Sequence, residues 1–283
     1  ARENNKRLYP IYLDDVDVPP AFAILLSNTH HSMADNMDKL IKALVRDLPA
    51  VAMDRLTIGD GELKKCEDNG RSITVDEGVR IICADAFKDR KALHTIILPQ
   101  TLETIGEESF RGCSNLEAMD VPEKTSRICS SAFRDCISMK SLMVRNGYIK
   151  IGERAFENCA SLESISLPDG LTEIYGGVFN SCKSLVHIDL PKNLTILGES
   201  AFSDCVCLEK IEVPEAVVKI DDLAFNGCTY LTKIVLHEGL RKIGKGAFKN
   251  CRNLKQIELP ISLSSIGDAP FRGCESIKSI HVD

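Results

Sequence analysis

Hydrophobic and polar positions recur along this chain with a period of 23 residues. Each period contains one Phe, and no insertion or deletion displaces it. A fixed period of this length is the signature of a solenoid, in which each copy coils once and stacks on its neighbour. Because a lone copy buries almost nothing, we expect the copies to fold only as an array. The nine repeated positions are Phe87, Phe110, Phe133, Phe156, Phe179, Phe202, Phe225, Phe248 and Phe271.

Further apolar residues follow each Phe at fixed distances. Three residues on is a Cys in every copy except the first, which has Arg90, and six residues on is a Leu, Met or Ile. Apolar residues also stand nine and eleven residues on, usually followed by a Pro. The alternation over these last positions predicts a short strand with two inward side chains, which the Pro ends.

The stretch from the small residue before each Phe to the Cys has helical spacing, and it predicts a single helical turn at most. Two residues after every Phe stands an Asp, Gly, Asn or Ser. These residue types tolerate left-handed backbone or form local hydrogen bonds, so they predict the end of the turn. The positions are Asp89, Gly112, Asp135, Asn158, Ser181, Asp204, Gly227, Asn250 and Gly273.

The consensus L-x-x-I-x-L-P-x-x-L-x-x-I-G-x-x-A-F-x-x-C resembles the BspA-type leucine-rich repeat, and the resemblance covers residues 81–283. This 23-residue class is found in surface proteins of bacteria and some protists. The resemblance implies an α/β-type solenoid: a right-handed coil with a parallel sheet on its concave side and short helical turns on its convex side. It also implies a role as an adhesin or as a binder of host or partner proteins, and it supplies no catalytic residues.

Residues 1–60 lack the repeat, and we interpret them as an N-terminal cap. Apolar residues between Met33 and Leu48 have helical spacing, Ser32 and Asp35 form a possible capping box, and Pro49 stops the helix. Residues 61–283 are then a partial first coil followed by nine copies. The chain stops in the middle of a repeat, which favours continuation of the natural protein beyond it; a true end at this point stays open.

Twelve cysteines suggest a disulfide scaffold at first sight, but their spacing favours another interpretation. One thiol per coil gives too few ligands for a metal site, and parallel side chains on stacked coils fit a disulfide poorly. We therefore interpret the Cys series as small core residues, reduced and free of metal. Among the cysteines outside the series, Cys207 takes a slot that is otherwise polar, and it is the candidate exposed thiol.

Composition and motifs give no support for an enzyme or a cofactor. The pair His30-His31 near Asp35 lacks a third metal ligand, and 59–61 lacks the context of a phosphate-binding loop. A net charge of −6 argues against a general nucleic-acid surface, and no apolar run approaches the roughly 20 residues of a membrane-spanning helix. Lys88, Arg111 and Arg134 form a short basic stripe, which we interpret as a plain solvated edge.

Binding is expected on the outward strand positions, eight and ten residues after each Phe. In the first four copies this strip is small, nearly uncharged and carries two apolar side chains; in later copies a basic row lies beside an acidic row. An ordinary solvated sheet surface remains an alternative. The candidate ligand-binding residues are Thr95, Ile97, Asp120, Ser141, Met143, Ser164, Ser166, His187 and Asp189.

These observations favour a noncatalytic binding scaffold, secreted or at the cell surface, with a protein or glycan ligand on its concave sheet. The alternative is a structural spacer, or an accessory region of a larger surface protein or enzyme. We expect no metal, no cofactor, no nucleic-acid partner and no membrane-spanning segment.

Overall fold

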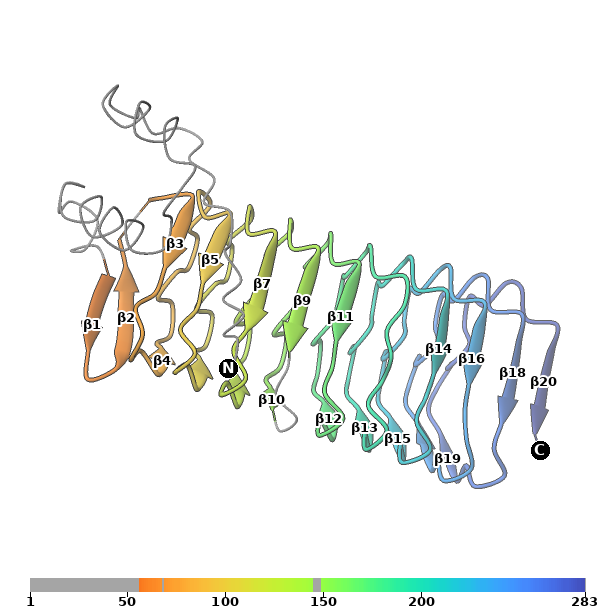
Figure 1. Cartoon of the computed structure of the whole chain (residues 1–283). Coiled ribbons are helices and arrows are strands. Elements are labelled where there is room, and N and C mark those ends of the chain that lie inside the picture. The colour runs from red at the N-terminus through yellow and green to blue at the C-terminus, as the bar shows by residue number, and fades with distance from the viewer. Residues whose placement is uncertain (1–55, 68, 145–148, 283) are drawn as a thin grey trace, which may run out of the picture. The chain divides into compact units, whose positions relative to one another are not determined.

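The computed structural model of this chain describes residues 56–67, 69–144 and 149–282. Within them the chain winds into stacked coils, and successive coils contribute parallel strands to two faces (Figure 1). Paired residues of neighbouring strands are one repeat apart, as Ser164 opposite Ser141 illustrates. The predicted solenoid of stacked coils with parallel strands is therefore confirmed.

The first sheet face consists of the strands that the period-two alternation predicts. In β11, for example, Ile165 is buried whereas its neighbours Ser164 and Ser166 are exposed. The strands of this face are β3 (Ser72–Thr74), β5 (Thr95–Ile97), β7 (Ala118–Val121), β9 (Ser141–Val144), β11 (Ser164–Ser166), β14 (Lys210–Glu212), β16 (Lys233–Val235), β18 (Gln256–Leu259) and β20 (Ser279–Val282).

A second sheet face lies across the coils, and the apolar pattern does not predict it. Within the repeats its strands are two residues long and end at the apolar residue five positions before a Phe, too short to display an alternation. The strands are β2 (Glu62–Cys66), β4 (Ile81–Ile82), β6 (Thr104–Ile105), β8 (Arg127–Ile128), β10 (Lys150–Ile151), β12 (Glu173–Ile174), β13 (Ile196–Leu197), β15 (Lys219–Ile220), β17 (Lys242–Ile243) and β19 (Ser265–Ile266), and β1 (Leu56–Gly59) pairs antiparallel with β2.

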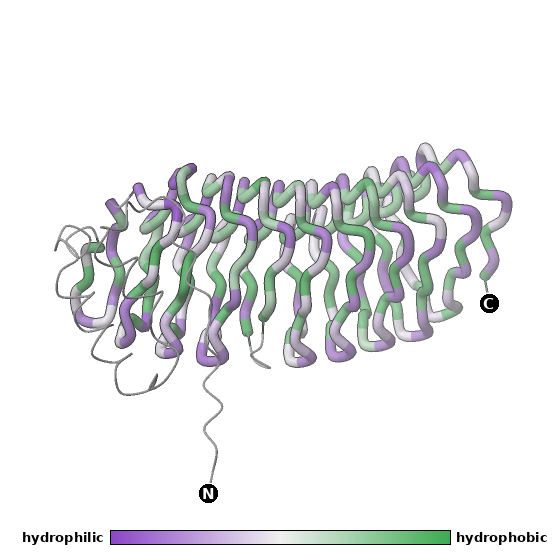
Figure 2. Tube along the Cα trace, turned by 45° about the horizontal axis from the view of Figure 1, so that its top comes forward, coloured by the Kyte–Doolittle hydropathy of each residue, from purple (hydrophilic) through white to green (hydrophobic). Residues whose placement is uncertain are grey.

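The core is built around a stack of Phe rings that extends from Phe87 to Phe271. Adjacent ring centroids lie between 4.8 and 5.6 Å apart, and the rings up to Phe248 are fully buried. Figure 2 shows hydrophobic residues recurring at the same place in successive coils. Because each ring from Phe110 to Phe248 is stacked between the rings of the coils before and after it, the core forms only when the copies stack.

The prediction of short helical turns is wrong, since the described residues contain no helix. Around Phe133 the N–H of Arg134 donates to the carbonyl of Ser131, and the N–H of Cys136 donates to that of Phe133, both at 3.1 Å. These bonds span three residues. Left-handed backbone at Ser131 (φ 55°) and Asp135 (φ 62°) interrupts the chain on either side, so a helix cannot propagate.

Left-handed backbone two residues after each Phe is confirmed in all nine copies, with φ from 58° at Asp89 to 79° at Gly273. A second left-handed position, two residues before each Phe, was not predicted. It is occupied by Gly177 and Gly246 but also by Leu223 and Ala269, so its composition carries no consistent signal. The fold imposes this conformation even on residues that disfavour it.

Both sheet faces are interrupted at the same level of the stack. We call this level the seam. On the first face residues 187–189 form no strand between β11 and β14. On the second face β10 pairs with β8 and β12 pairs with β13, but β10 and β12 do not pair with each other. The rings of Phe179 and Phe202 are inclined by 17°, more than any other neighbouring pair in the stack. The turns across the seam remain bonded, because the N–H of Phe156 donates to the carbonyl of Val178 at 3.0 Å.

The predicted N-terminal cap lies almost entirely outside the described residues. Positions 1–55, which include the predicted amphipathic helix, are not described; only 56–60 are, and they contribute β1. A cap at 1–60 and a solenoid at 61–283 therefore stay predictions.

Candidate ligand-binding face

All nine predicted ligand-binding residues are exposed on the first sheet face. They come from β5, β7, β9, β11 and the unpaired segment 187–189. Their exposure follows from the alternation within each strand, because the residues between them point into the core. Ile97 is 62% exposed and Met143 46%, so each presents an apolar surface to solvent.

Six of the nine residues surround one hollow of about 320 Å³, which we call the serine hollow: Asp120, Ser141, Met143, Ser164, Ser166 and Asp189. Its floor is formed by inward-facing residues of the same strands, including Leu142 and Ile165. Three short serine side chains on neighbouring strands leave the space, and Met143 supplies an apolar wall. Thr95 and Ile97 line neither this hollow nor the one described next.

A second hollow of about 650 Å³ adjoins the first, and Asp189 lines both. We call it the acidic hollow. It contains two imidazole–carboxylate pairs: His187 Nε2 lies 2.9 Å from Asp189 Oδ1, and His237 Nε2 lies 3.7 Å from Glu212 Oε1. Its polar lining consists of Asp169, His187, Asp189, Lys192, Glu212, Glu215 and His237.

The acidic hollow includes residues that the sequence analysis did not select. His237 stands at the position that holds Pro in most copies, and Asp169 and Glu215 come directly after that position in their own copies. The replacement of Pro by His237 is visible in the sequence and could have identified this residue as unusual. Asp169 and Glu215 could not be identified from the sequence, because only the stacking of the coils brings them beside the strand residues.

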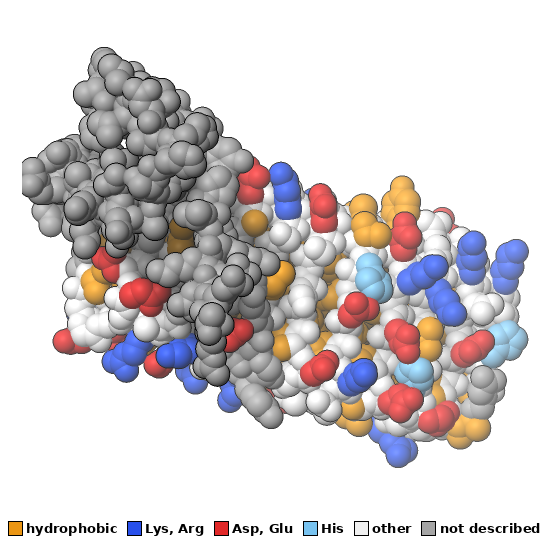
Figure 3. Space-filling view, viewed as in Figure 1, with side chains coloured by type: hydrophobic (Ala, Val, Ile, Leu, Met, Phe, Trp, Pro, Cys, Tyr) orange, Lys and Arg blue, Asp and Glu red, His pale blue; other side chains and the backbone are white. Residues whose placement is uncertain are grey.

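The two hollows have a strongly acidic lining. Together they contain the carboxylates of Asp120, Asp169, Asp189, Glu212 and Glu215 but only one lysine, Lys192. Figure 3 shows carboxylates and histidines gathered on this face. Lys210 and Lys233 stand earlier on β14 and β16 and line neither hollow. A mainly acidic lining favours a ligand of positive charge.

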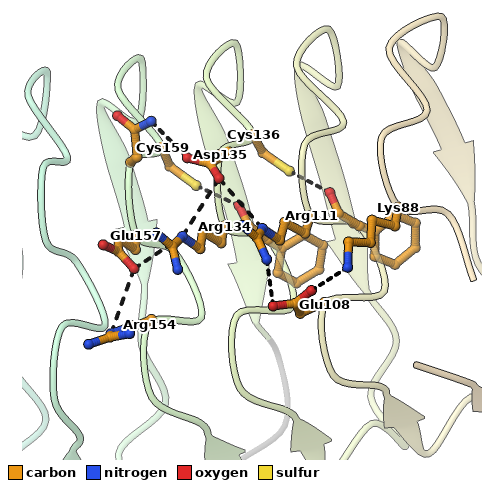
Figure 4. Close-up of polar contacts among 12 residues, drawn as sticks. Lys88, Glu108, Arg111, Arg134, Asp135, Cys136, Arg154, Glu157 and Cys159 are labelled. Atoms are coloured by element: carbon orange, nitrogen blue, oxygen red, sulfur yellow. Dashed lines mark hydrogen bonds and ion pairs between the residues drawn. The ribbon is translucent and has the colours of Figure 1, made fainter. Parts of the chain in front are cut away.

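The basic stripe on the turns is ion-paired rather than simply solvated (Figure 4). Lys88 Nζ lies 2.6 Å from Glu108 Oε2, Arg111 Nη1 lies 2.7 Å from Glu108 Oε1, and Arg134 Nε lies 3.3 Å from Glu157 Oε2. The hydrogen bond from Lys88 lowers the pKa of the Glu108 carboxyl, and the same contact raises the pKa of Lys88. These acids neutralise the stripe, so it is a poor candidate for an anion-binding surface.

The cysteines of the repeats belong to the core, as the spacing predicts. Each thiol that stands three residues after a Phe donates to the carbonyl of the Phe in the preceding copy; Cys136 and Cys159 in Figure 4 are examples, at 3.1 and 3.2 Å. Burial raises the pKa of Cys113 to about 12, which disfavours the reactive thiolate. Cys207, the candidate exposed thiol, is half-buried. Cys83, Cys129 and Cys274 are half-buried too, so the partial exposure of Cys207 does not distinguish it from them.

Other features of the described residues do not add a metal site or a membrane-spanning helix. No helix among them is long and apolar enough to cross a membrane, and no group of three or more His, Cys, Asp or Glu side chains there is arranged to hold a metal ion. A hollow of about 440 Å³ lies at the seam on the second face, where Tyr175 occupies a position that is mostly Gly. Its lining mixes carboxylates with Arg154 and Lys219, and Lys219 is already paired with Asp221 at 2.8 Å.

Comparison with known families gives a match over most of the chain. A family model described as the BspA type leucine rich repeat region matches residues 56–186 and 149–278, with six copies. A search of curated proteins finds no match.

Solved leucine-rich repeat structures resemble this fold. A leucine-rich repeat protein from Bacteroides ovatus is 26% identical with a TM-score of 0.50; the match covers 75% of this chain and 66% of that one. The Treponema pallidum leucine rich repeat protein is 22% identical with a TM-score of 0.51, covering 82% and 91%. A leucine rich cell surface protein from Faecalibacterium prausnitzii is 18% identical with a TM-score of 0.43, covering 78% and 90%. The chain thus spans about two thirds of the Bacteroides protein.

Proposed function

Because this chain belongs to the BspA-type leucine-rich repeat family, we propose that its solenoid is a noncatalytic scaffold that binds a protein or a glycan across the first sheet face. The observation that carries the proposal is the serine hollow, around which six outward-facing residues converge. A solenoid supplies a broad and regular surface, and a hollow interrupts that regularity at one place where a ligand can be held.

The first sheet face supports this proposal better than the other surfaces. The turn edge is neutralised by its own ion pairs, and the hollow on the second face is lined by charges of both signs. The first face combines exposed Met143, three short serine side chains and a mainly acidic lining. An interface needs apolar contact for affinity and polar groups for orientation, and this face offers both.

A location at the cell surface or outside the cell is part of the proposal. It is supported by the family, a class known from bacterial surface proteins. Reduced cysteines are compatible with such a location, because the repeat thiols are enclosed in the core. A role as a spacer within a larger surface protein would leave the hollows without a ligand, so ligand binding distinguishes the two functions.

The test is to fill the serine hollow and measure binding. Ser141→Arg combined with Ser166→Arg places two long side chains in the hollow, whereas Ser126→Arg combined with Ser265→Arg adds the same charge away from it. Wild type and both variants are applied to glycan arrays and to surface-protein extracts from host and neighbouring cells. We expect one ligand that wild type and the control bind and the filled variant loses. A ligand retained equally by all three proteins contradicts binding at this face, provided that circular dichroism shows equal folding.

A further inference from the structure

The geometry of the two hollows points to a narrower ligand class: an extended, basic segment of another protein, with an apolar side chain in the serine hollow and Lys or Arg side chains in the acidic hollow. This inference rests on the proposed function, since it assumes binding at the first sheet face. It goes further by assigning the chemistry of the partner and its orientation along the stack.

The serine hollow fits an aliphatic side chain of the partner. Its wall is the side chain of Met143, which is 46% exposed, and its floor contains Leu142 and Ile165. Met side chains are flexible and polarisable, so they adapt to aliphatic partners of different shape. Ser141, Ser164 and Ser166 leave room above that floor while offering hydroxyl groups at its rim.

The acidic hollow fits cations. Asp189 and Glu212 project from adjacent coils, with side chains that are 94% and 76% exposed, and Asp169 and Glu215 enclose the same space. The imidazoles of His187 and His237 contact two of these carboxylates but leave them open to solvent. A Lys or Arg that enters here gains several carboxylate contacts at once, and a fork-shaped guanidinium can accept two of them.

The seam creates the acidic hollow. Residues 187–189 form no strand, and among the described residues no backbone hydrogen bond joins them to β11 or β14. The regular surface of the sheet is therefore broken next to the serine hollow. The two hollows share Asp189, so one ligand can occupy both.

The spacing of the coils sets the length of the segment. Strands in a sheet lie about 4.8 Å apart, so the three coil steps from Met143 to Glu212 span about 14 Å. An extended chain advances about 3.3 Å per residue, so this span corresponds to about four residues. We therefore expect an apolar residue separated from a cation by about four positions, in a segment that lies across the strands.

Charge distinguishes this partner from a glycan. The lining opposes sulfated or carboxylated sugars, and it contains no Phe, Tyr or Trp ring on which a sugar could stack. Lys210 and Lys233 flank the hollows without lining them. They repel a cation placed at the start of their strands and so favour its position beside Glu212.

The experiment is a selection from a phage-displayed library of random 12-residue segments on three immobilised proteins. One is wild type, and the second carries Asp189→Lys and Glu212→Lys in the acidic hollow. The third carries Glu258→Lys and Glu103→Lys, exposed carboxylates outside both hollows, so its net charge changes equally. We expect wild type and the control to enrich segments with at least two Lys or Arg about four residues from an aliphatic residue. The hollow variant should retain them at least about tenfold less, which corresponds to about 1.4 kcal/mol.

The outcomes distinguish the basic partner from binding at the first sheet face as such. Equal retention of basic segments by the hollow variant and the control overturns the inference, because it indicates unspecific attraction. The enriched segments are then tested against the Ser141→Arg/Ser166→Arg variant of the serine hollow. Neutral or acidic segments that wild type binds and this variant loses overturn the basic partner but leave binding at the face intact. Glycan binding that is lost in the same double-Arg variant also overturns the basic partner and leaves binding at the face intact. Absence of any segment or glycan whose binding depends on this face overturns both.

Discussion

The thiol of Cys159 donates a hydrogen bond to the backbone carbonyl of Phe133, 3.2 Å away and one copy earlier in the chain. The same bond recurs from Cys113 to Phe87 at 3.0 Å and from Cys251 to Phe225 at 3.2 Å. Cys therefore has a defined role in this repeat: it is small enough for a slot between coils, and it donates a second hydrogen bond to a carbonyl that already accepts the backbone N–H three residues on.

Burial of the Cys113 thiol predicts that the protein loses stability in alkali. Burial raises the pKa of Cys113 from 9.0 in the unfolded chain to about 12, so the folded state keeps a proton that the unfolded state releases. The stabilisation is fully present below pH 9 and is lost as pH rises toward 12. In that window we expect a loss of about 1.4 kcal/mol per pH unit from Cys113.

Urea unfolding at pH 8 and pH 10 measures this loss. Cys113→Ser keeps a donor for the Phe87 carbonyl but does not ionise, so it should weaken the pH dependence. Equal pH dependence in wild type and Cys113→Ser would contradict the assignment. In a parallel assay all twelve thiols should react after denaturation, and the eight buried ones should be protected in the native protein.

Loss of a central ring should be the most damaging change in the core. Phe179 is fully buried between Phe156 and Phe202, with centroid distances of 5.6 and 5.3 Å. Phe179→Ala leaves a cavity and should cost about 3–5 kcal/mol in the free energy of unfolding. Ser166→Ala, at an exposed strand position, should change it by less than about 0.5 kcal/mol. Similar urea midpoints for the two variants would mean that the rings do not hold the stack together.

Left-handed backbone at Ala269 offers a route to higher stability. Its φ is 48°, a conformation that costs a residue with a Cβ about 1–2 kcal/mol, and Ala269 is exposed. Ala269→Gly relieves this strain and should raise the free energy of unfolding by about 0.5–1 kcal/mol after the entropy cost of Gly. Ala92→Gly is the matched control, because Ala92 is exposed and not left-handed. Ala92→Gly should lower the free energy of unfolding. If both variants lower it, Ala269 is not strained.

Close approach of coils at Gly106 should not tolerate a side chain. A Cβ at Gly106 would lie 2.4 Å from the carbonyl oxygen of Ile82, which is backbone and cannot move without shifting the coil. Gly106→Ala should therefore cost about 1–3 kcal/mol. At Gly176 the nearest atom to an added Cβ is the Glu199 carbonyl oxygen at 3.4 Å. The melting temperature of Gly176→Ala should therefore be close to that of wild type. If the melting temperature of Gly106→Ala is equally close to that of wild type, the tight contact at Gly106 is refuted.

The sequence by itself determined the repeat, its first strand and its left-handed turn. Phe133, Cys136 and Leu142 recur with one spacing, and alternation around Leu142 separates exposed Ser141 and Met143 from the core. These features are local. The residues that decide them lie within one copy, so composition and periodicity are sufficient to predict them.

Only the tertiary structure decided the second sheet face, the absence of helices from the described repeats, and the hollows. The strand Thr104–Ile105 is too short to be recognised, and left-handed Leu223 and Ala269 carry no residue signal. Asp169, Glu212 and His237 come from three different copies, and they line one hollow because coils stack and 187–189 does not pair. Pairing between coils depends on how well neighbours fit across the stack, a property that no single repeat contains.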